Sequence, residues 1–359
     1  MKPMCYVGLD VHALTTDLAV LSASGQLVQR HRCRTTIPEL VGVFEKIGRP
    51  MHVVLEEGPL ADWLYRNLTH HVDEITVAEP RRNRLIAKDS DKDDPLDAEK
   101  LAQLLRGGYL KPVHHPDSLD RVIFKQHVAL YHDCVRQRVR TANRIIGLLA
   151  RHGLCVREQA FSRPRKRPGL LDRLPTHTVL RKDLGLLWQS YDLAAEHVAD
   201  MRRRLKRLAR REEPIRRFVH LPGVKWVRAA TFFAYVDSPW RFASKQKLWK
   251  YCGIGLERRA SGAKRRRVRL AHRANRVLKY VLLGAARSAV VRGNNPFASQ
   301  SQQWLGKGSF PAVALRKTAR SLTATLWAMW KTGRTYDPNR VATSPTPSII
   351  ASAPANGRT

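Results

Sequence analysis

Short runs of β-branched and apolar residues alternate with turns over the first hundred residues. Three such runs, Cys5–Val11, Asp17–Ser22 and Gln26–Cys33, are joined by short turns and predict a three-stranded antiparallel meander. The pattern then predicts a helix, a strand, a helix, a strand and a helix, in that order. These elements are Ile37–Ile47, Met51–Leu55, a helix that opens at Pro59, Glu74–Ala78, and Asp94–Arg106.

A meander followed by crossover units is the strand order of the ribonuclease H-like fold. We therefore expect an α/β domain of that kind over residues 4–115.

The middle of the chain has a different periodicity. Apolar residues fall at roughly heptad spacing from Val128 to Leu149. A cleaner series of alternating four- and three-residue steps follows: Leu187, Tyr191, Ala194, Val198, Met201, Leu205 and Leu208. With the Pro- and Arg-rich link Phe161–Pro175 between them, the two stretches predict a coiled-coil helical arm over residues 116–214. Two ordinary amphipathic core helices are the alternative.

A third, mainly α-helical unit is expected over residues 215–337. The turn Leu221–Lys225 leads into a helix and is typical of a helix-hairpin-helix-like element, whose backbone N–H groups bind phosphate. The helices expected here are Trp226–Val236, Lys245–Tyr251, Val277–Val291 and Pro311–Lys331, with a basic loop before the third. The tail 338–359 is rich in Ser, Pro, Thr and Ala, which predicts disorder.

Charge is the most unusual feature of the composition. The 359 residues include 65 Lys and Arg but only 30 Asp and Glu, a formal net charge of +35. A surface this positive favours a polyanionic partner, so nucleic acid is the expected ligand. No uncharged apolar run reaches the ~18 residues that span a bilayer, and no membrane partner is expected. The five cysteines are far apart, which is typical of a reduced cytoplasmic protein without structural zinc.

The few acidic residues cluster at predicted element ends. Asp10 ends the first strand, Glu56 and Glu57 follow the fourth, and Asp94 and Asp97 lie three residues apart in a helix. In the expected fold these places converge at one end of the sheet, where carboxylates select Mg²⁺. Glu56 is preferred over Glu57 because it directly follows the apolar run. Strand-end and helix-cap roles for these acids are the alternative.

A basic run without acids carries the second candidate site. It contains nine basic residues: Arg258, Arg259, Lys264, Arg265, Arg266, Arg267, Arg269, Arg273 and Arg276. Ser261 and Gly262 lie inside it, and a serine among arginines is well placed to attack a phosphate. An ordinary turn is the alternative for this pair. Nucleic-acid contacts are expected from Gly223, Lys225, Gly262 and the basic residues from Arg258 to Arg269.

Together these segments resemble the DEDD-type transposases of bacterial insertion sequences, the insertion sequence 110 family. These are RuvC-like recombinases that work with a bridge RNA. The resemblance covers about residues 4–150 and 216–300. YVGLDVH carries Asp10, VVLEEG carries Glu56, and KDDPLDAEKLA carries Asp94 and Asp97. LPGVKWVRAATFFAYV and FASKQKLWKYCGI resemble the second transposase domain, and RRASGAKRRR carries Ser261.

The resemblance implies a mechanism. The four carboxylates would hold Mg²⁺ at the scissile phosphate of double-stranded DNA, and Ser261 would attack it to form a phosphoserine link. The acidic site and the serine would come from different protomers, which implies a dimer or tetramer. A structured guide RNA would select donor and target DNA. The protein would be cytoplasmic in a bacterium, and nucleoid-associated when bound to DNA.

Two other functions stay open from the residues themselves. A metal-dependent RuvC-like nuclease or Holliday-junction resolvase would use the carboxylates with water as the nucleophile. A non-enzymatic nucleic-acid-binding protein would use the acids only as caps and turns.

Overall fold

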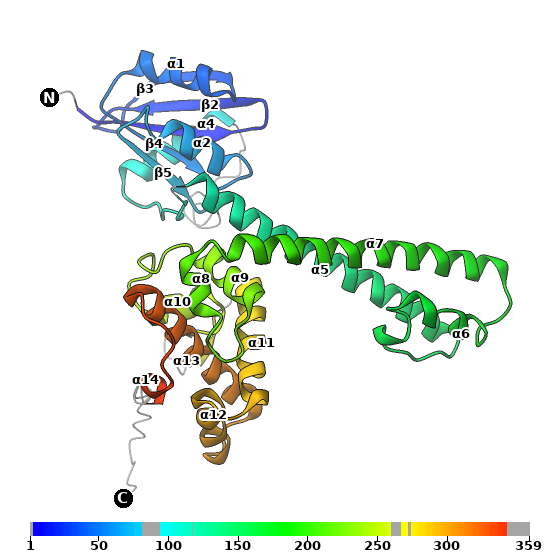
Figure 1. Ribbon diagram of the computed structural model, residues 1–359. Helices are drawn as coiled ribbons and strands as arrows, with labels where there is room; N and C mark the ends of the chain where they lie inside the picture. The colour runs from blue at the N-terminus through cyan, green and yellow to red at the C-terminus, as the bar shows by residue number, and fades with distance from the viewer. Residues whose placement is uncertain (1–2, 81–93, 117, 260–266, 272–273, 343–359) are drawn as a thin grey trace, which may run out of the picture. The chain divides into compact units, whose positions relative to one another are not determined.

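The computed structural model describes residues 3–80, 94–116, 118–259, 267–271 and 274–342 (Figure 1). The chain forms two compact units, residues 1–117 and 118–359.

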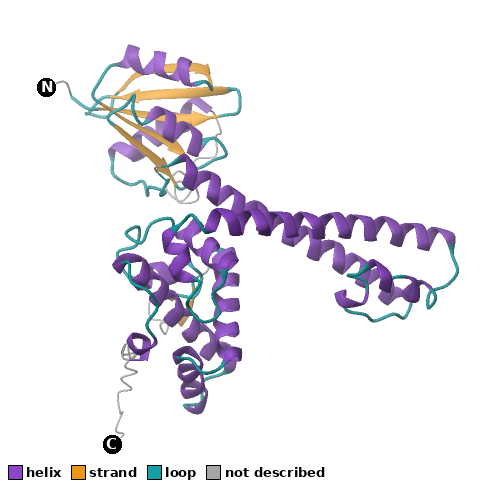
Figure 2. Ribbon diagram, in the orientation of Figure 1, coloured by secondary structure: helices purple, strands orange, loops and turns teal. Residues whose placement is uncertain are grey.

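The first unit is built on a five-stranded sheet with the order β3-β2-β1-β4-β5 (Figure 2). Its strands are β1 (Cys5–Val11), β2 (Thr15–Leu21), β3 (Leu27–Arg34), β4 (Met51–Glu56) and β5 (Glu74–Ala78). The first three form an antiparallel meander, and β4 and β5 continue the sheet in parallel with β1. This mixed sheet is compatible with the expected ribonuclease H-like fold.

Helices cover both faces of this sheet. They are α1 (Ile37–Ile47), α2 (Ala61–Leu68) and α4 (Asp94–Arg106). The predicted strands and helices are confirmed, although α2 begins two residues after Pro59. One face of the sheet carries Leu9, Val53 and Leu55, which form a core with apolar residues of α1 and α2. The opposite face packs against α4, whose Leu101 and Leu105 lie in a separate small core with Val54.

Glycine at position 8 lets α4 approach the sheet closely. A Cβ atom at Gly8 of β1 would lie 2.0 Å from the backbone oxygen of Ala98 and 2.8 Å from the backbone nitrogen of Ala102. No larger residue fits without moving the helix, since real Cβ atoms essentially never come within 3.0 Å of a heavy atom to which they are not linked through neighbouring residues. This contact fixes α4 over β1, the strand that carries Asp10.

Two long helices form the arm in the second unit. They are α5 (Leu119–Arg151) and α7 (Thr178–Ala209), which pack against each other, and short turns of helix lie between them (Figure 1). These turns are η1 (Glu158–Ala160), η2 (Pro164–Lys166) and α6 (Pro168–Leu171). Every residue of the heptad series expected in α7 is buried or half-buried. The two helices are confirmed, and their coiled-coil character stays a prediction.

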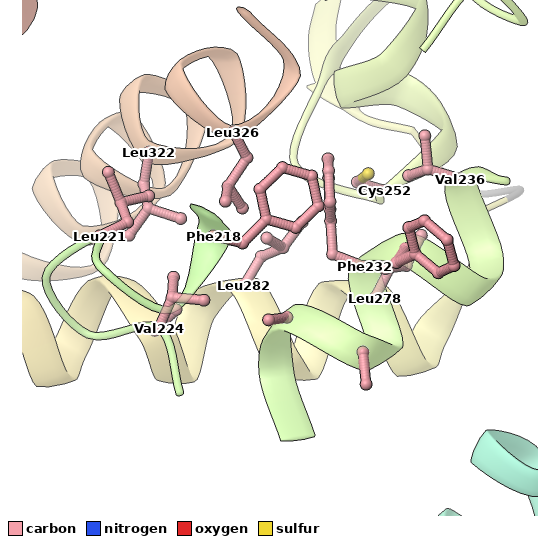
Figure 3. Packing of buried hydrophobic residues seen from close by; sticks show 14 of the residues in the cluster. Phe218, Leu221, Val224, Phe232, Val236, Cys252, Leu278, Leu282, Leu322 and Leu326 are labelled. Carbon is pink, nitrogen blue, oxygen red and sulfur yellow. The ribbon is translucent and has the colours of Figure 1, made fainter. Parts of the chain in front are cut away.

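The rest of the second unit is mainly helical. Its helices are α8 (Glu213–Phe218), α9 (Trp226–Val236), α10 (Lys245–Tyr251), α11 (Arg276–Arg292), α12 (Pro296–Gly306), α13 (Pro311–Thr332) and α14 (Pro338–Ala342). Figure 3 shows the centre of its core, where Phe218 and Phe232 meet Leu282 of α11 and Leu326 of α13. The expected helices are confirmed, and α8 and α12 are additional ones.

Two expectations for this unit are wrong. The basic segment after Tyr251 is not only a loop, because β6 (Leu256–Arg259) and β7 (Arg267–Leu270) pair as an antiparallel hairpin. The chain after Pro338 begins with α14, where Val341 is only 5% exposed and its carbonyl accepts a hydrogen bond from Gln300. Burial of Val341 explains why a polar tail still starts with a helix; residues 343–359 lie outside the described residues.

None of the helices in the described ranges combines the length and apolar character needed to cross a membrane.

Candidate active site

Two predicted carboxylates lie at equivalent positions on neighbouring strands. In the parallel pairing of β1 and β4, Leu9 is opposite Leu55, and Asp10 and Glu56 each follow by one residue. Side chains alternate along a strand, so Asp10 shares the sheet face of Gly8, and Glu56 shares that of Val54. Both acids therefore lie on the face covered by α4, at the carboxyl ends of parallel strands.

The direction of α4 brings its first turn to this same end of the sheet. Its last residue, Arg106, contacts the β2–β3 turn at Ala23 and Gly25, which lies beside the start of β1. The helix is thus antiparallel to β1, and its N-terminus lies towards Asp10. Asp97 is exposed in this first turn, and Asp94 is the first residue of α4, with a side chain outside the described part. All four predicted positions thus lie around one end of the sheet, where β1 and β4 finish.

The neighbouring acid, Glu57, has a different environment from Glu56. Glu57 follows the end of β4 and is exposed, and its backbone N–H donates a hydrogen bond to the carbonyl of Ala78. Glu56 is the last residue of the strand and is half-buried. The alternation of side chains directs Glu56, rather than Glu57, to the α4 face.

Asp10 has a basic neighbour on its own strand end. The Nε2 atom of His12 lies 3.1 Å from Oδ2 of Asp10, and the Asp10 side chain is 24% exposed. The backbone carbonyl of His12 accepts a hydrogen bond from the Thr35 hydroxyl, which anchors the turn after β1. The Asp10 carboxylate is therefore partly accessible to solvent, while its strand end is fixed.

A further acid, Asp17, was not singled out from the sequence. Asp17 lies directly opposite Asp10 in the β1–β2 pairing and opposite Arg32 in the β2–β3 pairing. Its side chain is 6% exposed, and Arg32 Nε is 3.9 Å from Oδ2. Burial raises the pKa of nearby Cys33, and the negative charges of Glu39 and Asp17 raise it further. The sequence offered one sign of Asp17, namely a single acidic residue within the mainly apolar segment TTDLAVL.

The acids at this end of the sheet are of the chemical type that a hard divalent cation prefers. Asp10, Glu56 and Asp97 offer carboxylate oxygens, the ligands that Mg²⁺ and similar ions prefer, and sulfur ligands are absent from this set. In the described part of the chain, no three acidic, histidine or cysteine residues already form a cluster that could hold a metal. The side chain of Asp94 lies outside that part.

Of the second candidate site, the structure describes the two strands that flank the serine-bearing segment. In the β6–β7 hairpin, Arg258 is opposite Val268, Arg259 is opposite Arg267, and Glu257 is opposite Arg269. The connecting residues 260–266 lie outside the described residues. They include the predicted Ser261, Gly262, Lys264, Arg265 and Arg266. The hairpin shows that strands hold both ends of the serine-bearing segment.

The turn before α9 has a structural reason for its glycine. Gly223 has a φ of +80°, and a Cβ atom there would lie 2.1 Å from the carbonyl oxygen of Ala285 in α11. Its flanking residues Leu221 and Val224 point into the core (Figure 3). Lys225, just before α9, is exposed. Close packing thus accounts for Gly223, and nucleic-acid contact by this turn stays a prediction.

Comparison with known proteins places both units in one class. Residues 7–153 match a family model of DEDD type whose description is "Transposase". Residues 215–302 match a second model, described as "Transposase IS116/IS110/IS902 family". The chain is thus a transposase with a DEDD-type N-terminal domain. Such a domain indicates the use of a divalent metal, and a transposase cuts and rejoins DNA.

Relatives along most of the chain agree with these matches. The transposase for insertion sequence element IS1111A of Coxiella burnetii (strain RSA 493 / Nine Mile phase I) is 22% identical over 307 residues, 85% of this chain and 83% of the relative. A Sinorhizobium fredii protein whose name describes it as a transposase, y4pF/y4sB, is 23% identical over 92% of this chain and 85% of its own length. The chain belongs to the IS110 family of insertion-sequence transposases.

Proposed function

We propose that this chain cuts and rejoins DNA strands by serine attack on a phosphodiester, with Mg²⁺ held at the edge of the sheet. The observation that carries the metal-dependent part of the proposal is the placement of Asp10 and Glu56 at equivalent ends of two parallel strands, on the face covered by α4. Two acids on one face and at one end of the sheet are placed to act together, which cap or turn roles do not require.

In this proposal the catalytic unit supplies the metal ligands. Asp10, Glu56, Asp94 and Asp97 hold Mg²⁺, which when bound stabilises negative charge on the phosphate oxygens. Asp10 and Glu56 are on rigid strands, and the close contact of α4 with Gly8 holds the helix that bears the other two acids. The site can therefore be preorganised before DNA binds.

Ser261 is the proposed nucleophile. Its Oγ forms a bond to phosphorus as one deoxyribose oxygen leaves, and the serine proton ends on that oxygen as a free hydroxyl. One phosphate ester bond replaces another, so rejoining needs no external energy. The basic residues around Ser261, from Arg258 to Arg269, would bind the DNA backbone. Gly262 would allow the backbone to approach closely, and Gly223 and Lys225 would add phosphate contacts.

The remaining parts of the proposal concern assembly and targeting. We assign residues 4–115 to catalysis, 116–214 to a coiled-coil arm and 215–337 to the serine-bearing domain. The arm would join protomers so that the acids of one act with the serine of another in a dimer or tetramer. A structured guide RNA would choose donor and target DNA, and a protein with a net charge of +35 suits both nucleic acids.

An adduct assay tests the serine step. The full-length protein is incubated with RNA transcribed from its flanking DNA, Mg²⁺ and an end-labelled junction duplex, and products are separated on denaturing gels. Wild-type protein and Ser24→Ala, a control at an exposed turn serine, are expected to give a labelled protein–DNA adduct. Ser261→Ala is expected to give neither an adduct nor rejoined DNA.

The same gels separate the alternatives. Cleaved DNA without an adduct in the wild-type protein would contradict serine attack and favour hydrolysis by a resolvase. Activity that survives in Asp10→Asn and without divalent metal would contradict the role of the carboxylates. Omitting the RNA is expected to abolish site-specific rejoining, and unchanged rejoining would contradict guidance by RNA.

A further inference from the structure

A basic groove runs along the second unit between α5 and the start of α11. Its volume is about 1020 Å³, and one face of α5 lines most of its length. Among the described residues, Arg276 is the member of the predicted basic run that lines it, and the described carboxylates of the first candidate site do not. We propose that this groove binds one strand of the DNA substrate beside the phosphodiester bond that is cut. The position of the bond that is cut comes from the proposed function, whereas the groove and its charges do not depend on it.

The charge of the groove has one sign. Among the described residues, five arginines line it and no acidic residue does: Arg136, Arg140, Arg144, Arg151 and Arg276. Asp133 forms an ion pair with Arg136 at 3.0 Å. Across the described ranges, no ion pair with an acid is found for the other four arginines. Four guanidinium groups are thus available for phosphate oxygens, which they can bind in bidentate fashion.

The arginines of α5 follow a regular spacing. Arg136, Arg140 and Arg144 are four residues apart, a rise of about 6 Å per step, and Arg151 extends the row to about 22 Å. A single DNA strand presents one phosphate per ~3.4 Å of helix axis. Each step along α5 therefore corresponds to about two phosphates. An extended polyanion fits this row better than a compact anion, which would contact only one arginine.

The surface between the charges suits sugars and bases. Two exposed residues line the groove between the arginines: Val139 of α5 is 40% exposed, and Tyr280 of α11 is 78% exposed. Exposed aromatic rings stack on bases, and apolar side chains contact deoxyribose. Gly147 also lines the groove and has open space where a Cβ atom would lie. The groove thus combines phosphate-binding and base-stacking features along one path.

The position of the groove in the fold favours DNA as its occupant. Its α11 wall begins at Arg276, soon after β7 closes the hairpin that holds the serine-bearing segment. A second copy of this chain would bring further positive charge to the same surface, because its net charge is +35. DNA cut near the hairpin would instead continue into a groove of opposite charge.

Binding measurements on the full chain test this inference. Fluorescence anisotropy is recorded with a labelled DNA duplex from the end of the element and, separately, with an RNA of equal length. All proteins carry Ser261→Ala, so the result does not depend on covalent chemistry. Arg140→Ala/Arg144→Ala removes two groove charges. Arg181→Ala/Lys182→Ala removes two exposed charges from α7, outside the groove, as the matched control.

The groove variant is expected to bind DNA roughly tenfold or more weakly, and its salt slope should fall by about 2. The α7 variant should change affinity by less than about threefold. Equal effects of both variants would overturn the groove as a specific surface. Loss of RNA binding with unchanged DNA binding would overturn DNA as the occupant. Failure of Ser261→Ala to abolish the adduct would overturn the serine step and leave this binding result standing.

Discussion

Asp17 lies directly opposite Asp10 in the antiparallel pairing of β1 and β2, and both side chains are on the sheet face covered by α4. The Asp17 side chain is 6% exposed and Arg32 is its ion-pair partner. A second, buried carboxylate thus adjoins the proposed metal-binding edge, and an arginine from β3 lies 3.9 Å from it.

Removing the arginine should cost more stability than removing the acid. Arg32→Gln leaves the buried Asp17 carboxylate without its partner, whereas Asp17→Asn removes the buried charge itself. We expect Arg32→Gln to lower the free energy of unfolding by about 1 kcal/mol, because Arg32 is 61% exposed, and Asp17→Asn to lower it by less. Chemical denaturation of the full chain measures both, with Arg34→Gln, 81% exposed, as the control. A larger loss in Asp17→Asn would contradict this account.

Gly8 should tolerate no side chain. In Gly8→Ala the new Cβ atom would meet the Ala98 backbone oxygen at 2.0 Å, so α4 would have to move from the sheet. We expect a loss of about 1–3 kcal/mol of stability, with loss of DNA cutting because the first turn of α4 shifts.

The matched control for this change is Gly42→Ala in α1. A Cβ atom at Gly42 has open space, and alanine favours the helix by up to about 1 kcal/mol. Thermal unfolding should show opposite shifts for the two variants. Equal shifts would contradict the close packing of α4 on β1.

Most of the sheet could be predicted from the sequence because β1, β2, β4 and β5 each carry a clear apolar run. The parallel pairing of β1 and β4 then brings Asp10 and Glu56 to the same end of the sheet, although their separation along the sequence gives no sign of this. The β6–β7 hairpin was missed because its arginine-rich strands lack apolar alternation, and cross-strand pairing supplies its order instead. The position of Asp17 beside Asp10 depends on the register of β1 and β2, which one strand alone cannot reveal.

His132 should make stability depend on pH. Burial, with a smaller contribution from Arg136, lowers its pKa from 6.5 to about 4, and its Nε2 lies 2.9 Å from the Thr231 hydroxyl. Because the folded-state pKa is the lower one, protonation favours unfolding. The contribution of His132 is complete above about pH 6.5 and is lost as the pH falls towards 4. Melting temperatures between pH 7 and 4.5 measure this loss.

The comparison protein for that experiment is His132→Gln, which keeps a donor for Thr231 but does not titrate. Its melting temperature should be a few degrees less sensitive to acid than that of the wild type. The same pH dependence in both proteins would exclude His132 as the titrating group.

The most direct test of the proposed active site compares two adjacent glutamates. DNA cutting at the ends of the element is measured for Glu56→Gln and Glu57→Gln, with Asp10→Asn as the reference for a lost carboxylate. Glu56 ends β4 beside Asp10, whereas Glu57 is exposed beyond the strand. The account predicts that Glu56→Gln, like Asp10→Asn, loses roughly 100-fold or more of the cutting rate. Glu57→Gln should stay within about threefold of the wild type. Full activity in Glu56→Gln, or a loss confined to Glu57→Gln, would contradict the proposed site at the end of β1 and β4.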